Sequence, residues 1–261
     1  MAEFRFLAGL PRSGSTVLAT LLSQHPQLHT SPTSILRDLL HSVQRYHLGE
    51  SPYFPRDSDQ CSNIQRGLLR GFYEHIDKPY VLEKDRGWSA NCRLIQNLTG
   101  ERPKVVATVR RVSEVLASFS LLADRVGASN KMDDELHQAN RPVTQLGRTR
   151  VLWEKYVYTS WRDFKVGYEN NRDCFHLVDY DHLVNNPLNA VRRVYDFLGL
   201  PPATTTIVKL TNPSPENDAI YGVPGLHDVR SKLERTSPPP EVVLGEEVCK
   251  FWDDKGLEFW R

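Results

Sequence analysis

Residues 4–22 form the segment that most restricts how this chain can fold. Phe4-Arg5-Phe6-Leu7-Ala8 has the apolar character of a short buried strand, and apolar residues recur at helical spacing over residues 17–22. The loop between them contains Gly9 and Gly14. Because the backbone N–H groups of such a loop and the positive end of the helix dipole point the same way, the segment predicts a site for a phosphate.

The loop sequence Leu10-Pro11-Arg12-Ser13-Gly14-Ser15-Thr16 almost fits the nucleoside-triphosphate signature G-x-x-x-x-G-K-[ST], but Ser15 stands at the lysine position. That lysine normally reaches the β- and γ-phosphates, while Thr16 would supply the magnesium-binding hydroxyl. A loop that lacks the lysine but contains Arg12 is better suited to one terminal phosphate than to a triphosphate. The alternative is a Gly-Ser-rich turn that binds nothing.

Together with His25-Pro26, this loop resembles the 5′-phosphosulfate loop of sulfotransferases that use 3′-phosphoadenosine-5′-phosphosulfate (PAPS), and most closely the tyrosylprotein-sulfotransferase-like branch with its bacterial relatives. The resemblance implies transfer of a sulfuryl group to an acceptor hydroxyl, or to an amine, with release of adenosine 3′,5′-bisphosphate (PAP) and no metal. It implies that Arg12 also stabilises the leaving oxygen. The residues expected to bind the 5′-phosphate are Arg12, Ser13, Gly14, Ser15 and Thr16.

A second phosphate site is predicted after the most strand-like run of the chain, residues 105–109. Arg110 follows this run directly, and Ser118 comes eight residues later on the next predicted helix. That spacing resembles the family's site for the 3′-phosphate of PAPS, and the planar fork of an arginine suits a phosphate because it donates two parallel hydrogen bonds. Arg111 stands where the family often has an aspartate. The alternative is that Arg110 is an ordinary surface charge.

The strand predicted at residues 79–82 ends in Glu83-Lys84-Asp85-Arg86. Ligands of open α/β sheets bind at such carboxyl ends, although four successive charges are also typical of a solvated turn. The resemblance implies that Lys84 is the catalytic lysine. The family's glutamate base would fall near Thr33, where this chain has no carboxylate, so the general base is left open among Glu83, Asp85, His227 and Asp228.

Two further segments resemble nucleotide contacts of the family. Tyr180 follows the strand predicted at residues 174–178 and matches the tyrosine of a Tyr-Glu-x-Leu segment. The proline-rich segment 211–240 contains a Ser-Lys-x-Glu-Arg run that is similar to a family loop folded over PAPS. This implies cofactor contacts from Arg230, Ser231 and Lys232, whereas proline-rich loops are otherwise often inert connectors.

Composition excludes several classes of function. Hydrophobic residues make up 39% and charged residues 25%, with a net charge of +1, so the chain resembles a globular protein without the charge expected of a nucleic-acid-binding domain. No stretch approaches the roughly 18 apolar residues of a membrane span. Cys61, Cys92, Cys174 and Cys249 lie far apart, which fits reduced thiols in a cytoplasm. We expect a soluble, cytoplasmic protein without a signal peptide, or a soluble domain cut from something larger.

The alternation of strands and helices predicts one α/β domain over residues 1–261: a P-loop-type, three-layer fold whose mostly parallel central sheet is formed by strands near residues 4, 80, 105 and 175. Residues 25–32 are expected to be a connection, and residues 127–147 a mobile insertion without apolar periodicity. The acceptor would be a small molecule or a peptide. The alternative functions are a small-molecule P-loop kinase and a non-catalytic protein that binds PAPS or PAP.

Overall fold

A computed structural model of the chain describes residues 2–50, 52–53, 57–213, 215–218, 225–235 and 237–261. Five strands form one parallel sheet in the order β2-β3-β1-β4-β5. The architecture is the predicted α/β fold, with all four predicted strands in the sheet. The strands are β1 (Glu3–Gly9), β2 (Leu28–Thr33), β3 (Tyr80–Lys84), β4 (Val105–Val109) and β5 (Phe175–Asp179).

β2 corrects the sequence prediction, which placed a connection at residues 25–32. Its sequence, Leu-His-Thr-Ser-Pro-Thr, is mostly polar and contains Pro32. The strand is nevertheless possible because it lies at the edge of the sheet, where a residue without an N–H group breaks no inner ladder. Its register with β3 shifts between Thr30 and Thr33.

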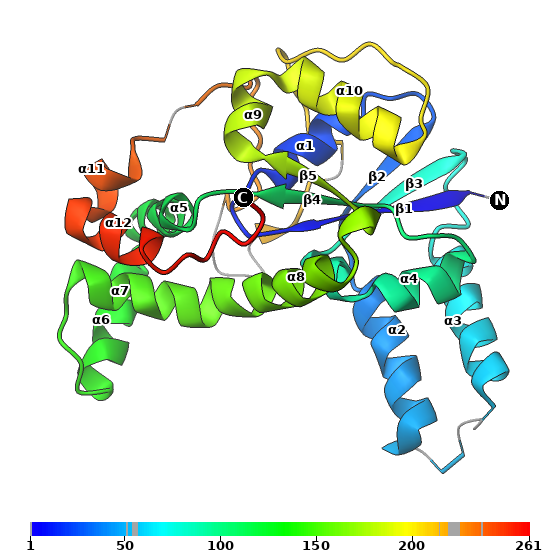
Figure 1. Ribbon diagram of the computed structural model, residues 1–261, viewed down its shortest axis with the longest axis horizontal. Helices are drawn as coiled ribbons and strands as arrows, with labels where there is room; N and C mark the ends of the chain where they lie inside the picture. The colour runs from blue at the N-terminus through cyan, green and yellow to red at the C-terminus, as the bar shows by residue number, and fades with distance from the viewer. Residues whose placement is uncertain (1, 51, 54–56, 214, 219–224, 236) are drawn as a thin grey trace.

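Helices cover both faces of the sheet (Figure 1). On one face α1 (Ser15–Leu22), α9 (Tyr180–Asn185) and α10 (Pro187–Leu198) lie over the strands, and their apolar side chains pack with Leu7, Leu82 and Val106. The other face packs Phe6, Val81 and other strand residues against helices that include α2 (Leu36–Arg45), α3 (Ser58–Phe72), α4 (Cys92–Thr99) and α8 (Tyr158–Asn170).

A third group of helices packs beyond the carboxyl end of β4 (Figure 1). Its members are α5 (Val112–Arg125), α6 (Ser129–Gln138), α7 (Gln145–Leu152), α11 (Pro240–Leu244) and α12 (Glu246–Asp253). α6 lies within residues 127–147, where the sequence showed no apolar periodicity. Met132 and Leu136, one turn apart, are 7% and 1% exposed and attach α6 to this group. The mobility of this segment stays a prediction.

Short irregular helices connect the regular elements. They are η1 (Tyr46–Glu50), η2 (Arg86–Ala90), η3 (Trp153–Val157) and η4 (Arg172–Cys174). Among the described residues, no helix has both the length and the apolar character that crossing a membrane requires.

The parallel register brings distant residues to one edge of the sheet. Leu7 of β1 is level with Lys84 of β3, and Gly9 is level with Thr108 of β4. Val109 is in turn level with Asp179, the last residue of β5. The segments that follow β1, β3, β4 and β5 therefore emerge side by side, which is where parallel α/β sheets bind ligands.

Candidate active site

The loop after β1 turns through residues with positive φ. These are Gly9 at 123°, Arg12 at 58° and Gly14 at 92°. A Cβ on Gly9 would lie 2.2 Å from the carbonyl oxygen of Thr108, so the loop passes β4 too closely for any side chain. Gly14 is the N-cap of α1, and no side chain in the described part of the chain caps this end of the helix. The first N–H groups of α1 are therefore left for an anion.

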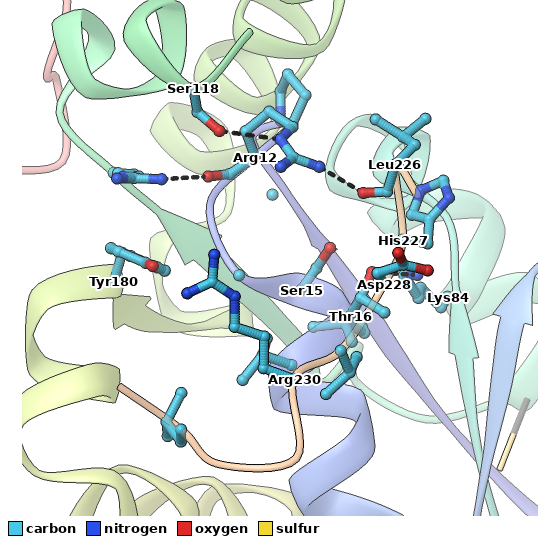
Figure 2. Close-up of a pocket in the computed structure, with 18 of the residues that line it drawn as sticks. Arg12, Ser15, Thr16, Lys84, Ser118, Tyr180, Leu226, His227, Asp228 and Arg230 are labelled. Carbon is cyan, nitrogen blue, oxygen red and sulfur yellow. Dashed lines mark hydrogen bonds between the residues drawn. The ribbon is translucent and has the colours of Figure 1, made fainter. Parts of the chain in front are cut away.

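A cavity, called here the first cavity, lies over this loop at the carboxyl edge of the sheet (Figure 2). It brings together most of the predicted site residues, although they come from segments far apart in the sequence. Predicted residues that line it are Arg12, Gly14, Ser15, Thr16, Lys84, Arg110, Ser118, Tyr180, His227, Asp228, Arg230 and Lys232. Figure 2 shows the Arg230 guanidinium directed into this space between Tyr180 and Ser15.

Ser13 is the loop residue whose side chain has another role. It is fully buried, and its Oγ donates to the carbonyl oxygen of Leu10 at 2.5 Å. The same hydroxyl lies 2.6 Å from Oγ1 of Thr108. The Ser13 side chain thus fastens the loop to β4 and does not line the cavity.

Arg12 crosses the first cavity between two elements (Figure 2). Its Nε donates to Oγ of Ser118 on α5 at 3.1 Å, and its Nη1 donates to the carbonyl oxygen of Leu226 at 2.5 Å. Burial, followed by the nearby positive charge of Arg110, lowers the pKa of Arg12 to about 10. The positive charge of the Arg12 guanidinium thus lies in a poorly solvated place, where an anion would be bound strongly.

Arg110 lies on the other side of the loop and is 6% exposed. Its Nη1 donates to the carbonyl oxygen of Arg12 at 3.1 Å, and its Nε donates to Glu114 at 3.2 Å. The guanidinium carbon lies 4.0 Å from the centroid of the Tyr180 ring, a cation–π contact. Arg110 and Ser118 therefore line the same cavity, but the Ser118 hydroxyl accepts a hydrogen bond from Arg12, and the 3′-phosphate site stays a prediction.

Lys84 is the last residue of β3, and its side chain is 8% exposed. Nζ donates to Oγ1 of Thr16 at 3.2 Å and to Oε1 of Glu216 at 2.6 Å. Burial lowers the pKa of Lys84, although the charge of Glu216 opposes this shift. Lys84 is thus a desolvated ammonium in contact with Thr16 of the loop after β1. The alternative that residues 83–86 form a solvated turn is therefore wrong for Lys84.

Glu83 lies outside the first cavity because successive side chains of a strand point to opposite faces. It is fully buried and accepts hydrogen bonds from Ser34 at 2.5 Å, from Ser31 at 3.2 Å and from the hydroxyl of Tyr73. Burial raises the pKa of Glu83 to about 7. This placement, on the side of the sheet away from Lys84, speaks against a role in catalysis.

The other base candidates differ in their surroundings. Asp85 accepts from Nε of Arg37 at 2.6 Å and from the N–H group of Gly87 at 2.7 Å, which caps η2. Asp228 is exposed at the rim of the first cavity. His227 is half-buried, and its Nδ1 lies 2.6 Å from Oδ1 of Asp218.

The segment that carries His227 also carries the predicted donors Arg230, Ser231 and Lys232. Arg230 and Lys232 line the first cavity, whereas the carbonyl oxygen of Ser231 accepts from the N–H group of Leu210. Val208 and Lys232 form an isolated antiparallel bridge that holds the segment in place. Residues 214, 219–224 and 236 of the predicted loop 211–240 lie outside the described residues.

Glu216 and Asp218 were missed by the sequence analysis. Glu216 contacts Lys84 and Thr33, so this carboxylate lies beside the position at which the family's glutamate was expected. Burial alone would raise the pKa of Glu216, but Lys84, together with smaller effects of His227 and the Thr33 N–H group, lowers it. The one signal in the sequence was the absence of a carboxylate near Thr33, which indicated either that the base lies in another segment or that the acceptor differs.

A second cavity, of about 600 Å³, adjoins the first. Thr33, Arg86, Leu226 and His227 line both cavities, and Glu216 lines the second. Residues of α5, α6, α7, η3 and α8 line the second cavity, and they include both apolar and charged side chains. Its apolar lining includes Phe119, Leu122, Ala123, Val126, Ala128, Met132, Val151, Leu152 and Tyr156.

Comparisons with known proteins bear on the family and the fold. The sequence model of the sulfotransferase family matches residues 6–204. A search of curated proteins finds no match.

Among solved structures, the sulfotransferase domain from the curacin biosynthetic pathway is 14% identical, with a TM-score of 0.51 over 97% of this chain and 91% of that one. A sulfotransferase from Alicyclobacillus acidocaldarius is 14% identical, with a TM-score of 0.47 over 84% and 88% of the two chains. Retinol dehydratase, in a complex with retinol and PAP, is 12% identical, with a TM-score of 0.45 over 98% and 81%. At 14% identity, the likeness to the curacin-pathway domain is a likeness of fold alone.

Proposed function

The chain belongs to the sulfotransferase family, and from this premise we propose that it transfers the sulfuryl group of PAPS to an acceptor hydroxyl and releases PAP. The observation that carries the proposal is the pairing of two anion-binding elements in the first cavity. One is the uncapped N-terminus of α1 with Ser15 and Thr16, and the other is the buried guanidinium of Arg110 with Ser118. A nucleotide with phosphates at both its 5′ and 3′ positions matches this pair.

In the proposed complex the 5′-phosphate lies at the N-terminus of α1, where free N–H groups and the helix dipole both favour an anion. The 3′-phosphate lies between Arg110 and Ser118. Tyr180, which already stacks under Arg110, is then placed to contact the nucleotide. Arg230, whose guanidinium lies between Tyr180 and Ser15, is placed to contact the nucleotide as well (Figure 2).

Arg12 and Lys84 would stabilise the reaction itself. As the bond between sulfur and the bridging oxygen breaks, negative charge develops on the oxygen of the 5′-phosphate. Lys84 already contacts Thr16 of the phosphate-binding loop, and both cations are largely shielded from water. Charges fixed in a poorly solvated site stabilise such a transition state more strongly than solvated charges do.

The kinase alternative has less support. Ser15 replaces the lysine that contacts the β- and γ-phosphates, and Arg110, not an aspartate that could bind magnesium, follows β4. The non-catalytic alternative leaves unexplained why a buried lysine lies between the first cavity and a carboxylate that lines the second.

Thermal unfolding with PAP, with adenosine 5′-monophosphate and with ATP–magnesium tests the proposal. PAP without metal is expected to give the largest rise in Tm, because binding to the native state alone stabilises it by about 2.7 kcal/mol at a hundredfold excess over Kd. Equal shifts from PAP and the monophosphate would refute the two-phosphate site, and a requirement for magnesium would favour the kinase. Mass-spectrometric detection of a sulfated acceptor then separates catalysis from binding.

A further inference from the structure

Glu216 is held at the junction of the two cavities. Its Oε1 accepts from Nζ of Lys84 at 2.6 Å, from the hydroxyl of Thr33 at 3.1 Å and from the N–H group of Thr33 at 3.3 Å. The side chain is 5% exposed. These three donors fix one carboxylate oxygen and therefore the orientation of the whole group.

The second oxygen of Glu216 is the unusual one. Oε2 is buried and has no hydrogen-bond partner among the described residues. It lies 3.3 Å from Nδ1 of His227, but that nitrogen is closer to Asp218, at 2.6 Å. Because a carboxylate oxygen without a donor is costly to bury, Oε2 indicates a place for a donor that arrives with a ligand.

The second cavity limits what that ligand can be. A volume of about 600 Å³ lies within the usual range for small-molecule sites. Beyond Glu216 and His227, apolar side chains such as Phe119, Leu122 and Met132, which are 6–8% exposed, form a large part of the wall. Charged side chains also line this cavity, among them Lys131, Glu135, Lys155 and Asp163. An apolar body is stabilised by such a wall, whereas a polyol would lose its hydrogen bonds to water there.

We propose that Glu216 is the proton acceptor of the reaction and that the second cavity binds the acceptor, a compact phenol or alcohol with an apolar body. This inference rests on the proposed function. The acceptor oxygen forms a bond to the sulfur of PAPS, the bond from sulfur to the bridging oxygen breaks, and its electron pair stays on the 5′-phosphate of PAP. The hydroxyl proton moves to Oε2 of Glu216.

The contact between Lys84 and Glu216 links the two halves of the reaction. The lowered pKa of Glu216 keeps the carboxylate ionised and able to accept a proton. As negative charge develops on the leaving oxygen, the ammonium of Lys84 is attracted toward that oxygen. Its ion pair with Glu216 then becomes weaker. The carboxylate thus becomes more basic at the moment when the proton moves.

Glu216→Gln tests this role with acceptors that differ in their need for a base. The variant and the parent are compared for transfer from PAPS to 2-naphthol and to 4-nitrophenol at mildly alkaline pH, where 4-nitrophenol is already largely ionised. Loss of a general base should slow transfer to 2-naphthol by about 10²–10⁴-fold. Transfer to 4-nitrophenol should fall far less. Glu154→Gln, an exposed glutamate outside both cavities, is the control and should change neither rate.

The outcomes separate this inference from the proposed function. A parent protein whose Tm does not respond to PAP would refute the proposed function itself. If the parent binds PAP and sulfates both phenols, an equal loss for both in Glu216→Gln would overturn the role as proton acceptor, because a positioning defect affects both alike. A parent that sulfates glucose but neither phenol would overturn the acceptor class.

The location of the acceptor is tested with a pair of matched substitutions at the two ends of α6. Ala128 precedes the helix and lines the second cavity, whereas Ala139 follows it and is exposed. Ala128→Phe should raise the KM for 2-naphthol by about tenfold or more without changing PAP affinity, because a misfit in an apolar pocket has effects of this size. Ala139→Phe should leave both unchanged. An unaltered KM in Ala128→Phe, with 2-naphthol still sulfated, would place the acceptor elsewhere.

Discussion

The ion pair between Lys84 and Glu216 makes a prediction about stability that does not depend on any activity. The two side chains are 8% and 5% exposed, and Nζ lies 2.6 Å from Oε1. Removing one partner of a buried pair leaves an uncompensated charge and typically costs about 3–5 kcal/mol, whereas replacing both partners is often close to neutral. Lys84→Met should therefore lower the free energy of unfolding by about 3–5 kcal/mol.

The double variant Lys84→Met/Glu216→Gln provides the decisive comparison. With the carboxylate made neutral, we expect much of the lost stability to return, although Lys84→Met by itself is strongly destabilising. The two substitutions should thus be non-additive by about 2–3 kcal/mol, within the range for residues in direct contact. An additive result would show that the two charges do not interact in the native state.

Urea unfolding followed by tryptophan fluorescence measures these changes, since the chain has 5 tryptophans. The m value should be the same in all variants, because it reflects the surface exposed on unfolding. The pair between Lys155 and Glu135 is the matched control: its atoms lie 2.5 Å apart, but the side chains are 48% and 39% exposed. Lys155→Met should cost at most about 1 kcal/mol, the usual value of an exposed pair. If Lys84→Met costs no more than this, burial does not govern the energy of the pair.

Three further predictions concern the nucleotide, the pH and the loop. Arg110→Ala should weaken PAP binding by about 1.5–3 kcal/mol, the value of a hydrogen bond to a charged group, but should barely affect adenosine 5′-monophosphate; calorimetry that shows equal losses would contradict the 3′-phosphate site. The pKa of Glu83 rises on folding from 4.5 to about 7, so the native state binds a proton more tightly and the free energy of unfolding should fall as the pH rises through this window. Glu83→Gln should remove up to about 3 kcal/mol of this fall in urea titrations, and identical pH profiles for parent and variant would show that Glu83 does not cause it. Gly9→Ala should lower the free energy of unfolding by more than about 3 kcal/mol, because the new Cβ would overlap Thr108. Gly256 also has a positive φ but lies in open space, so Gly256→Ala should cost about 1–2 kcal/mol. Similar unfolding midpoints for the two variants would refute the steric argument.

The strands that could be predicted from the sequence are those that contain a run of apolar residues. All five residues of β4 are buried, and the segment reads Val-Val-Ala-Thr-Val. β2 has no such signal, because an edge strand has one neighbour and tolerates His29, Ser31 and Pro32. Its place in the sheet follows from hydrogen bonds to β3, which are a property of the folded chain and leave no mark on the composition of β2 itself.

The nucleotide half of the candidate site could be predicted for a related reason. Arg12, Lys84 and Arg110 each follow or end a buried strand, and parallel pairing brings such ends to the same edge whatever lies between them in the sequence. Strand pattern and topology together therefore predict the cluster of cations. The hydrogen bonds within the cluster could not be predicted, and Ser118 bonds to Arg12 instead of Arg110.

The carboxylate half has a different physical origin. Glu216 belongs to no helix or strand, and it reaches the site from a position 132 residues after Lys84. What holds it there is the requirement that a buried ammonium be paired, since an unpaired charge inside a protein is far more costly than the loss of chain entropy in one surface segment. That requirement predicts that some carboxylate must contact Lys84. The requirement for a paired charge does not predict which acidic residue of an irregular segment contacts Lys84. Each such residue could reach the site at a similar entropic cost of loop closure. The choice depends on Thr33, whose N–H and hydroxyl groups meet the same oxygen of Glu216, and a threonine at the end of an edge strand gives no sign of this role before the chain is folded.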